Sequence, residues 1–158
     1  MKKAIAAITQ ITTTVNQDAL ARDTVGIFTQ MPDSSASAPV SDLAAEGALA
    51  YLTEMSADLR GAAFLADDGT VLAAVGDSEA WGDPVRALLA AADGAGDEPV
   101  EQIHVTTEGG EVFVLRQDGL VAVAVTDRFV LSSLMAFDMR AALRRLAASA
   151  TPAAGGAV

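Results

Sequence analysis

The stretch Gly61–Ala73, which reads GAAFLADDGTVLA, decides the expected fold. Two apolar runs flank the acidic turn Asp67-Asp68-Gly69. An Asp-Gly pair between apolar runs indicates a β-hairpin, because glycine adopts the left-handed backbone of a tight turn at little cost. The turn superficially resembles a calcium loop, but the alternating oxygen ligands and the closing Glu of an EF-hand are missing. We therefore predict two strands, over residues 62–66 and 70–75.

Helix signals lie on both sides of this hairpin. Ser41 can cap a preceding helix, which Gly61 ends. Apolar residues recur there every three or four positions and are expected to face inward: Leu43, Ala48, Leu52, Met55 and Leu59. After the hairpin, Asp83 and Pro84 suit the N-cap and the first position of a second helix, which stops at Gly94.

Three further strands follow in quick succession. The segment 100–107 alternates, with Ile103 and Val105 on one face of the strand. The next two strands, at residues 112–115 and 120–125, are apolar on both of their faces. Strands of that composition imply that helices cover the sheet from both sides.

A final helix is expected over residues 130–148. Its predicted inward residues are Leu131, Leu134, Met135, Ala142 and Leu146. The whole order is helix, two strands, helix, three strands, helix. It predicts an α+β domain, in which a five-stranded antiparallel sheet carries helices on both faces.

The composition excludes several classes of function. The chain has 158 residues, no cysteine and one histidine, so disulfide frameworks and multi-histidine metal sites within one chain are ruled out. A formal net charge of -11 argues against nucleic-acid binding, which needs clustered Lys and Arg. Eleven of the acids lie between Asp67 and Glu111, beside a single arginine. This acidic segment is either a solvated face or a surface that meets a basic partner.

The sequence contains none of the common catalytic or nucleotide-binding motifs. G-x-x-x-x-G-K-[ST], G-x-G-x-x-G, G-x-S-x-G and H-E-x-x-H are all absent. His104 has no serine nucleophile pattern beside it and is interpreted as a surface or interface histidine. Trp81 is a contact anchor if exposed and a core residue if buried. We expect a protein that is not an enzyme and has no cofactor and no metal.

Residues 1–40 are expected to form an N-terminal extension and linker. The first residues resemble the start of a signal peptide, but Thr9 and Gln10 interrupt the apolar run too early. Isoleucine and valine at helical spacings could form an apolar stripe there: Ile5, Ile8, Ile11 and Val15. No apolar run approaches the ~20 residues that cross a bilayer. We expect a cytoplasmic protein without membrane insertion.

The hairpin and the later strands together resemble the Roadblock (dynein light chain) family, in its bacterial GTPase-regulator-like form. The resemblance rests on GAAFLADDGTVLA at 61–73, IHVTTEGGEVFVL at 103–115, the strand 120–126 and the closing helix. It covers residues 41–148, which we take as the domain, followed by a disordered tail at 149–158. Profilin-like relatives share parts of the pattern, and the Trp-Gly-Asp-Pro entry to the middle helix is unusual for the family.

The resemblance implies a homodimer, or a heterodimer with a similar chain. In the family, the middle helix and the following strand pair across a two-fold axis. The contact residues carried over to this chain are Val85, Leu88, Leu89, Ala92, Ile103 and Val105. Family members act as non-catalytic scaffolds or regulators of small Ras-like GTPases, sometimes as activating proteins. The candidate surface for such a partner comprises Asp77, Glu79, Trp81 and Asp83.

Two alternatives belong to other functional classes. A PAS- or GAF-like ligand-sensing domain would need a pocket between the sheet and a helix. Small strand residues such as Ala122 and Ala124 could leave that space, or could simply allow a helix to pack closely. A small enzyme that uses acidic residues would need two carboxylates converging in a cleft, which no spacing in this sequence requires.

Overall fold

A computed structural model describes residues 40–76 and 78–150 of the chain. The order of elements is the predicted one, with a short 3₁₀ turn, η1, added before the second helix. The elements are α2 (Asp42–Met55), β1 (Leu59–Ala66), β2 (Val71–Ala74), η1 (Ser78–Ala80), α3 (Gly82–Asp93), β3 (Gln102–Thr107), β4 (Gly110–Gln117), β5 (Leu120–Thr126) and α4 (Ser132–Ala150).

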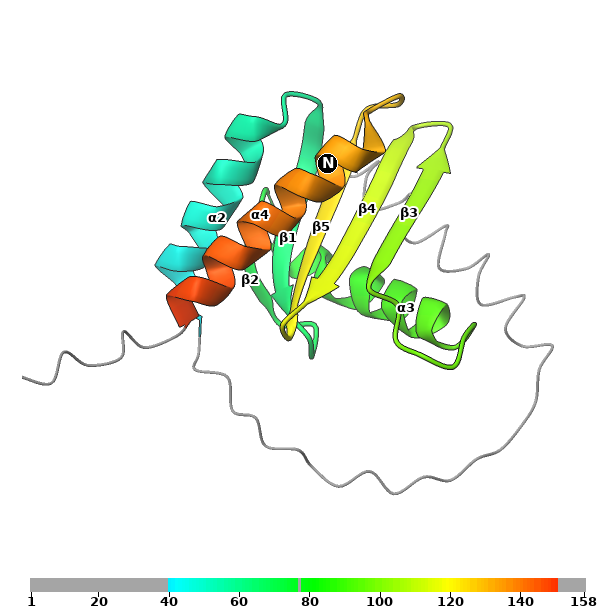
Figure 1. The fold of residues 1–158 in the computed structure, drawn as a ribbon, viewed down its shortest axis with the longest axis horizontal. Helices are drawn as coiled ribbons and strands as arrows, with labels where there is room; N and C mark the ends of the chain where they lie inside the picture. The colour runs from blue at the N-terminus through cyan, green and yellow to red at the C-terminus, as the bar shows by residue number, and fades with distance from the viewer. Residues whose placement is uncertain (1–39, 77, 151–158) are drawn as a thin grey trace, which may run out of the picture.

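The five strands form one antiparallel sheet in the order β2-β1-β5-β4-β3. Strand β5, which comes last in the sequence, lies at the centre and pairs with β1 on one side and β4 on the other. Its residues are buried along its whole length, as expected for a strand that is apolar on both faces. Strands β2 and β3 form the two edges (Figure 1).

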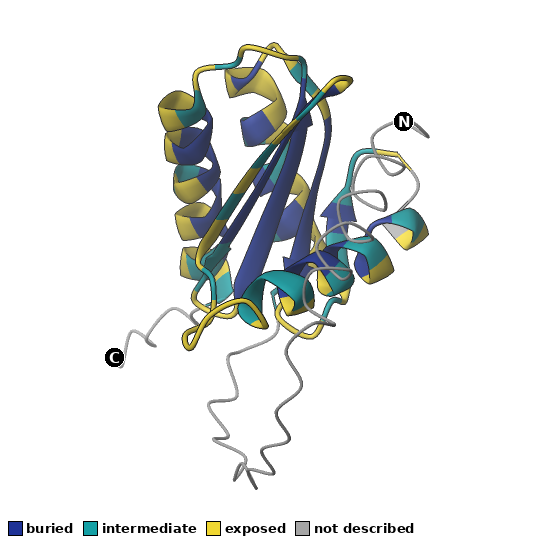
Figure 2. Ribbon diagram, turned by 90° about the vertical axis from the view of Figure 1, so that its right-hand side faces the viewer, coloured by how far each residue is buried: buried dark blue, intermediate teal, exposed yellow. Residues whose placement is uncertain are grey.

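Helices cover both faces of the sheet, as predicted. Helices α2 and α4 lie side by side on one face, whereas α3 lies behind the sheet on the other (Figure 1). Each face has its own core. The first joins α2 and α4 to residues such as Phe64 and Phe113, and the second joins α3 to residues such as Leu65 and Val123. Figure 2 shows the buried sheet between these two helical layers.

Helix α2 is shorter than the sequence predicts, and a different side of it faces the sheet. Ser41 caps it as expected, because its hydroxyl accepts a hydrogen bond from Ala44 N–H, but the helix ends at Met55. Leu59 is the first residue of β1 and not part of the helix. The predictions that Leu43 and Met55 face inward are wrong, since both are exposed. The buried face consists mainly of alanines, which allow close packing of the helix.

The other two helices show smaller differences of the same kind. Helix α4 begins at Ser132, so Leu131 precedes it, and the predictions that Leu131 and Leu134 face inward are wrong, since both are exposed. It continues to Ala150, two residues past the predicted domain boundary. Helix α3 begins at Gly82 after Trp81 as its N-cap, so the prediction of Asp83 as the N-cap is wrong. Pro84 lies within the first turn, where its missing N–H has no intrahelical partner to lose.

Some predictions concern residues outside the described ranges. These are the extension and linker up to residue 39, Asp77, and the tail at residues 151–158. Within the described ranges, no helix is long and apolar enough to cross a bilayer.

Candidate functional site

Strand β3 presents an exposed sheet edge. In the described part of the chain it pairs only with β4, in a register that places His104 opposite Phe113. Its side chains alternate as predicted: Ile103 and Val105 are half-buried, and Ile103 packs on the core under α3. The backbone N–H and C=O groups along such an edge can pair with a strand of another chain. This edge is therefore available for strand addition.

Helix α3 lies on the same face as Ile103. It buries three residues that the sequence assigned to contact with a partner, namely Val85, Leu88 and Leu89. Their apolar side chains fill the second core, so the structure places them inside the chain rather than on its surface. Only Ala92 among the four α3 residues of that set remains half-exposed. The accessible part of the set is thus Ala92 on α3 and the two apolar residues of β3.

Trp81 also lies in the core. It is 0% exposed, and its ring leaves so little room over Gly61 that an added Cβ would lie 3.1 Å from it. The structure therefore supports the buried alternative for this tryptophan, and the Trp81 side chain is not accessible to a partner. Glu79 and Asp83 are exposed around the start of α3, so they supply negative charge there. Asp77, the fourth candidate, lies outside the described residues.

Arg116 of β4 ties the end of α3 to the sheet. Its guanidinium donates to both carboxylate oxygens of Asp93, at 3.0 and 3.3 Å, and its Nε lies 3.4 Å from a carboxylate oxygen of Asp67. Burial alone would raise the pKa of Asp93, but the hydrogen bond from Val100 N–H and the Arg116 charge hold that pKa below its usual value of 3.8. The acidic segment is therefore partly neutralised at this point.

A cavity of about 190 Å³ lies beside this ion pair, between α3 and the sheet. Arg86, Arg116, Asp67 and Asp93 stand among its lining residues. Its apolar lining comes from β1, α3 and β5 and includes Leu65, Val85, Leu89 and Val121. The cavity combines apolar walls with charges of both signs.

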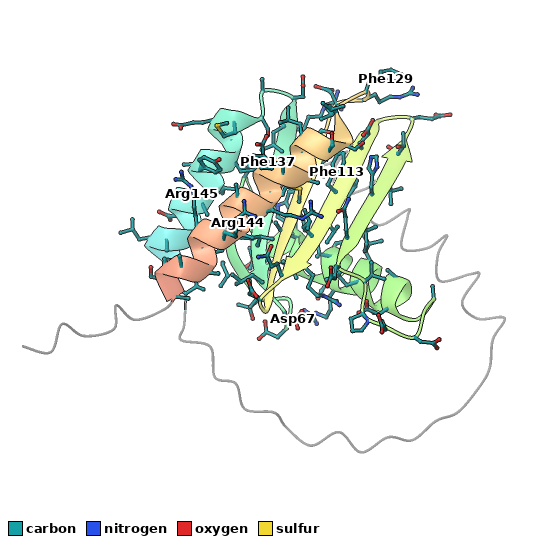
Figure 3. All side chains as sticks on the ribbon, viewed as in Figure 1. Asp67, Phe113, Phe129, Phe137, Arg144 and Arg145 are labelled. Atoms are coloured by element: carbon teal, nitrogen blue, oxygen red, sulfur yellow. The ribbon has the colours of Figure 1, made fainter. Side chains whose placement is uncertain are left out.

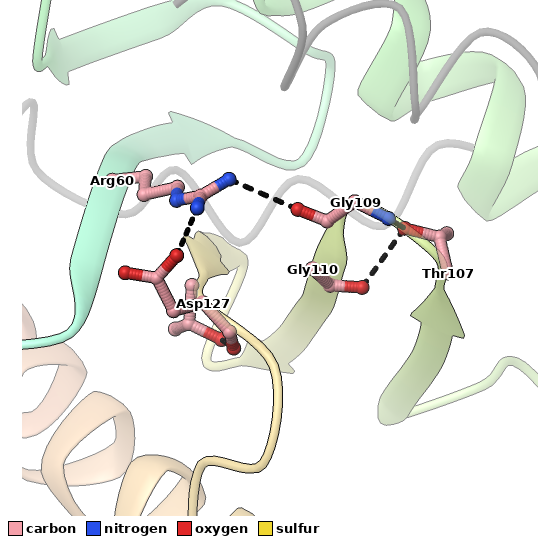
Figure 4. Close-up of polar contacts among 6 residues, drawn as sticks. Arg60, Thr107, Gly109, Gly110 and Asp127 are labelled. Atoms are coloured by element: carbon pink, nitrogen blue, oxygen red, sulfur yellow. Dashed lines mark hydrogen bonds and ion pairs between the residues drawn. The ribbon is translucent and has the colours of Figure 1, made fainter.

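The hairpin between β3 and β4 is held from a distant strand. Arg60 of β1 donates to the carbonyl oxygen of Gly109 at 2.9 Å and forms an ion pair with Asp127 (Figure 4). The Thr107 hydroxyl donates to the carbonyl oxygen of Gly110 at 2.8 Å within the hairpin (Figure 4). The position of the hairpin, and with it the end of the edge strand, is thereby fixed to the rest of the sheet.

A buried carboxylate links the other face of β3 to the loop before α4. Glu111, the last residue of the acidic segment, is only 5% exposed. One of its oxygens accepts from His104 Nε2 at 2.9 Å, and the other accepts from Phe129 N–H at 2.9 Å. The His104 ring stacks on Phe113, with 4.3 Å between ring centroids. Sequence reasoning missed this network, since only the strand register places these residues together.

The described residues include neither a metal-binding cluster nor a bonded serine–histidine pair. Among residues 40–76 and 78–150, no three His, Cys, Asp or Glu side chains gather so as to hold a metal ion. His104 has a carboxylate partner, and no serine hydroxyl bonds to it in the described part of the chain. The exposed edge and the surfaces beside it are the features that a partner could use.

Solved structures share the fold of this chain. MglB, a gliding protein from Thermus thermophilus, is 19% identical, with a TM-score of 0.56 over 68% of this chain and 90% of that one. Myxococcus xanthus MglB is 12% identical, with a TM-score of 0.54 over 81% and 100%. The fold is Roadblock-like. A Roadblock/LC7 domain from Streptomyces avermitilis also matches, at 20% identity and a TM-score of 0.48, over 65% and 91%. No protein-family model and no curated protein sequence matches the chain.

Proposed function

We propose that this Roadblock-like chain acts as a dimeric, non-catalytic scaffold or regulator, and that its target is a small Ras-like GTPase. The observation that carries the dimer is the edge strand β3, whose outer side has no strand partner among the described residues and which has half-buried apolar side chains at Ile103 and Val105. Pairing with β3 of a second copy would satisfy that backbone and cover those side chains. A similar chain could take the place of the second copy.

The role in GTPase regulation rests on the resemblance to the Roadblock family together with the acidic start of α3. Glu79 and Asp83 are exposed there, and Gly82 at the start of α3 lies against Gly69 and Val71 of the β1–β2 hairpin. In a two-fold dimer, these acids would occur twice on one surface and favour association with a basic patch of the partner.

The dimer is tested by measuring mass in solution. We expect light scattering to give twice the chain mass of 16.1 kDa for the full chain. Ile103→Lys should shift the mass toward the monomer, because dimerisation would bury the introduced ammonium groups of the two copies against each other. Thr106→Lys, at an exposed position on the opposite face of β3, is the matched control. A full chain that is monomeric at micromolar concentration rejects the proposed dimer.

The GTPase role needs its own assay. Small Ras-like GTPases from the source organism, loaded with GDP or with a GTP analogue, are passed over the immobilised full chain, and GTP hydrolysis is measured with and without it. We expect Glu79→Lys with Asp83→Lys to weaken capture. Asp97→Lys with Glu98→Lys, in the exposed loop after α3, is the charge-matched control. Equal capture by both double variants would rule out the acidic start of α3 as the binding surface.

Ligand sensing remains the second candidate, because the 190 Å³ cavity lies between a helix and the sheet. Its apolar walls and paired charges suit a small molecule that carries both an apolar and a charged group. Native mass spectrometry of the full chain should then show a retained small molecule, and Val85→Trp should exclude it. A chain mass without added molecules speaks against sensing.

A further inference from the structure

Exposed apolar side chains gather where α2 ends and α4 begins. Of the six large hydrophobic residues that are exposed among the described residues, five lie at this place; we term them the apolar end: Met55, Phe129, Leu131, Leu134 and Phe137. The two helices meet there, since Ser56 Oγ lies 3.4 Å from Asp138 Oδ2 and within 4.0 Å of Met135 Sδ. The sixth residue, Leu43, lies at the other end of α2. A cluster of this kind marks an interaction site more often than scattered exposed residues do.

The loop before α4 holds Phe129 outward at an energetic cost. Phe129 has a φ of 67°, a left-handed conformation that aromatic residues rarely adopt, and it is 87% exposed. Its N–H donates to the buried carboxylate of Glu111 at 2.9 Å, and this hydrogen bond helps to fix the conformation. Such strain persists where surrounding structure fixes it, and it collects at binding sites. The Arg128 guanidinium lies 4.9 Å from the ring centroid and leaves the other side of the ring open.

Arginines continue the surface along α4. Phe137 and Arg144 are seven residues apart, which is two turns, so they share one line of the helix surface roughly 10 Å apart. Phe137 is 60% exposed, and Arg144 is exposed as well (Figure 3). Arg140 reaches from the helix to Gln102 of β3, at 2.8 Å. The only acid of α4 is Asp138, which is buried, so the outward face is apolar at its start and cationic further along.

We propose that the apolar end and the outward face of α4 dock an acidic amphipathic segment of a partner protein. Apolar side chains of that segment would cover Leu134 and Phe137, and its carboxylates would pair with Arg140 and Arg144. Exposed aromatic anchors with flanking arginines have the composition of binding hot spots. This surface lies on the face of the sheet opposite to α3, so it is separate from the acids used in the proposed function. It meets the edge strand at Arg140, which donates to Gln102 of β3.

Charge distinguishes this occupant from the others. A second copy docked through the same surface would bring arginines against arginines. The N-terminal segment, with its apolar stripe from Ile5 to Val15, begins with Lys2 and Lys3 and offers no acid in that stripe. An anionic membrane would attract the arginines but repel a chain whose net charge is -11. A segment with its own carboxylates fits best.

The test uses the full chain and a displayed library of random 16-residue peptides. We expect selection to enrich peptides with apolar residues at helical spacing and several Asp or Glu. Phe137→Ser should weaken the enriched peptides at least about tenfold in fluorescence anisotropy. Arg144→Glu should weaken them as well, and added salt should reduce binding. Leu43→Ser is the matched control and should leave peptide affinity unchanged. Both serine variants should have the same mass in solution, by light scattering, as the unchanged full chain.

Other outcomes reject the proposal. No enrichment, or enriched peptides that bind Phe137→Ser as well as the unchanged chain, means that this surface does not dock such a segment. If the full chain sediments with vesicles of phosphatidylcholine and phosphatidylglycerol, and Phe137→Ser abolishes this sedimentation, the surface binds membranes instead. If Ile8→Asp in the full chain speeds peroxide oxidation of Met55 several-fold, the chain's own N-terminal segment is the occupant. A change of mass caused by Phe137→Ser would identify a second copy.

Discussion

Gly110 is a position where only glycine fits. Its φ is 149°, and an added Cβ would overlap the carbonyl oxygen of Thr126 on the neighbouring strand. We expect Gly110→Ala to lower the free energy of unfolding by about 2–4 kcal/mol, because backbone rather than a flexible side chain must move. Gly47→Ala is the control: its site in α2 is open space, so the change should stabilise by about 0.5–1 kcal/mol. Urea unfolding measures both. A Gly110→Ala protein of unchanged stability would contradict the strand packing described above.

Asp93 gives a pH dependence whose sign follows from its environment. Its pKa is lowered in the folded chain, so it stabilises the fold above its unfolded value near 3.8, and this contribution is lost as the pH falls through the lower folded value. We expect Asp93→Asn to be less stable than the unchanged chain at pH 7. The difference should shrink between about pH 5 and about pH 3. Asp68, whose pKa the Thr70 N–H lowers, is present in both proteins. Urea midpoints across this range are the measurement, and a difference that persists at low pH contradicts the assignment.

Individual site residues were the hardest to predict. Burial of Glu111 follows from two partners that the strand register brings to it, and no local pattern shows this. Burial of Trp81 depends on its packing over Gly61 of a distant strand, which no local sequence pattern shows. By contrast, the alternation of β3 correctly separated Ile103 from His104, because a period of two requires only local geometry.

At the scale of elements, α3 is attached to the sheet mainly by apolar contacts, with Arg116 at its end. We expect Leu88→Ala to lower the free energy of unfolding by about 2–5 kcal/mol, since Leu88 is fully buried beneath the helix. Trp81, the only tryptophan, lies in the same core, so its emission should shift to longer wavelength if α3 loosens. Leu43→Ala, at an exposed site, should leave emission and stability nearly unchanged. Equal effects of the two variants would contradict the packing of α3.

The existence and order of the elements could be predicted, but the rotation of the helices could not. Turn residues and periodicity indicated each helix and strand in its place. The larger side chains of α2 and α4 were expected to face inward, yet Leu43, Met55 and Leu134 are exposed. Alanines at Ala45 and Ala48 bury instead, because close approach of a helix favours small residues. The hydrophobicity of individual side chains does not include this packing contribution, so it does not predict which side of the helix is buried.

For the whole molecule, the acidic segment and the arginines of α4 lie on opposite faces of the sheet, and α2, beside α4, adds exposed carboxylates at Asp42, Glu46 and Glu54. The acidic segment between Asp67 and Glu111 contributes α3 and the edge strand, whereas α4 presents arginines on the opposite side of the sheet. The uneven charge could be predicted from the sequence. The side of the sheet on which each charged segment lies could not, because it depends on which helices cover which face. Two partners of opposite charge could therefore bind at the same time without competing for one surface.

The two edges of the sheet are unequal, and this limits how far the molecule can assemble. Strand β3 has six residues in regular register, whereas β2 has four and its pairing with β1 shifts between Phe64 and Leu65. If two β3 strands join as proposed, both long edges are consumed and the ends of the joined sheet are two short, irregular strands. Growth by further strand addition then has no adequate template. The shortness of β2 would thus act as a stop: in the proposed assembly it would make a pair the terminal product, where an equally long edge would permit a fibre.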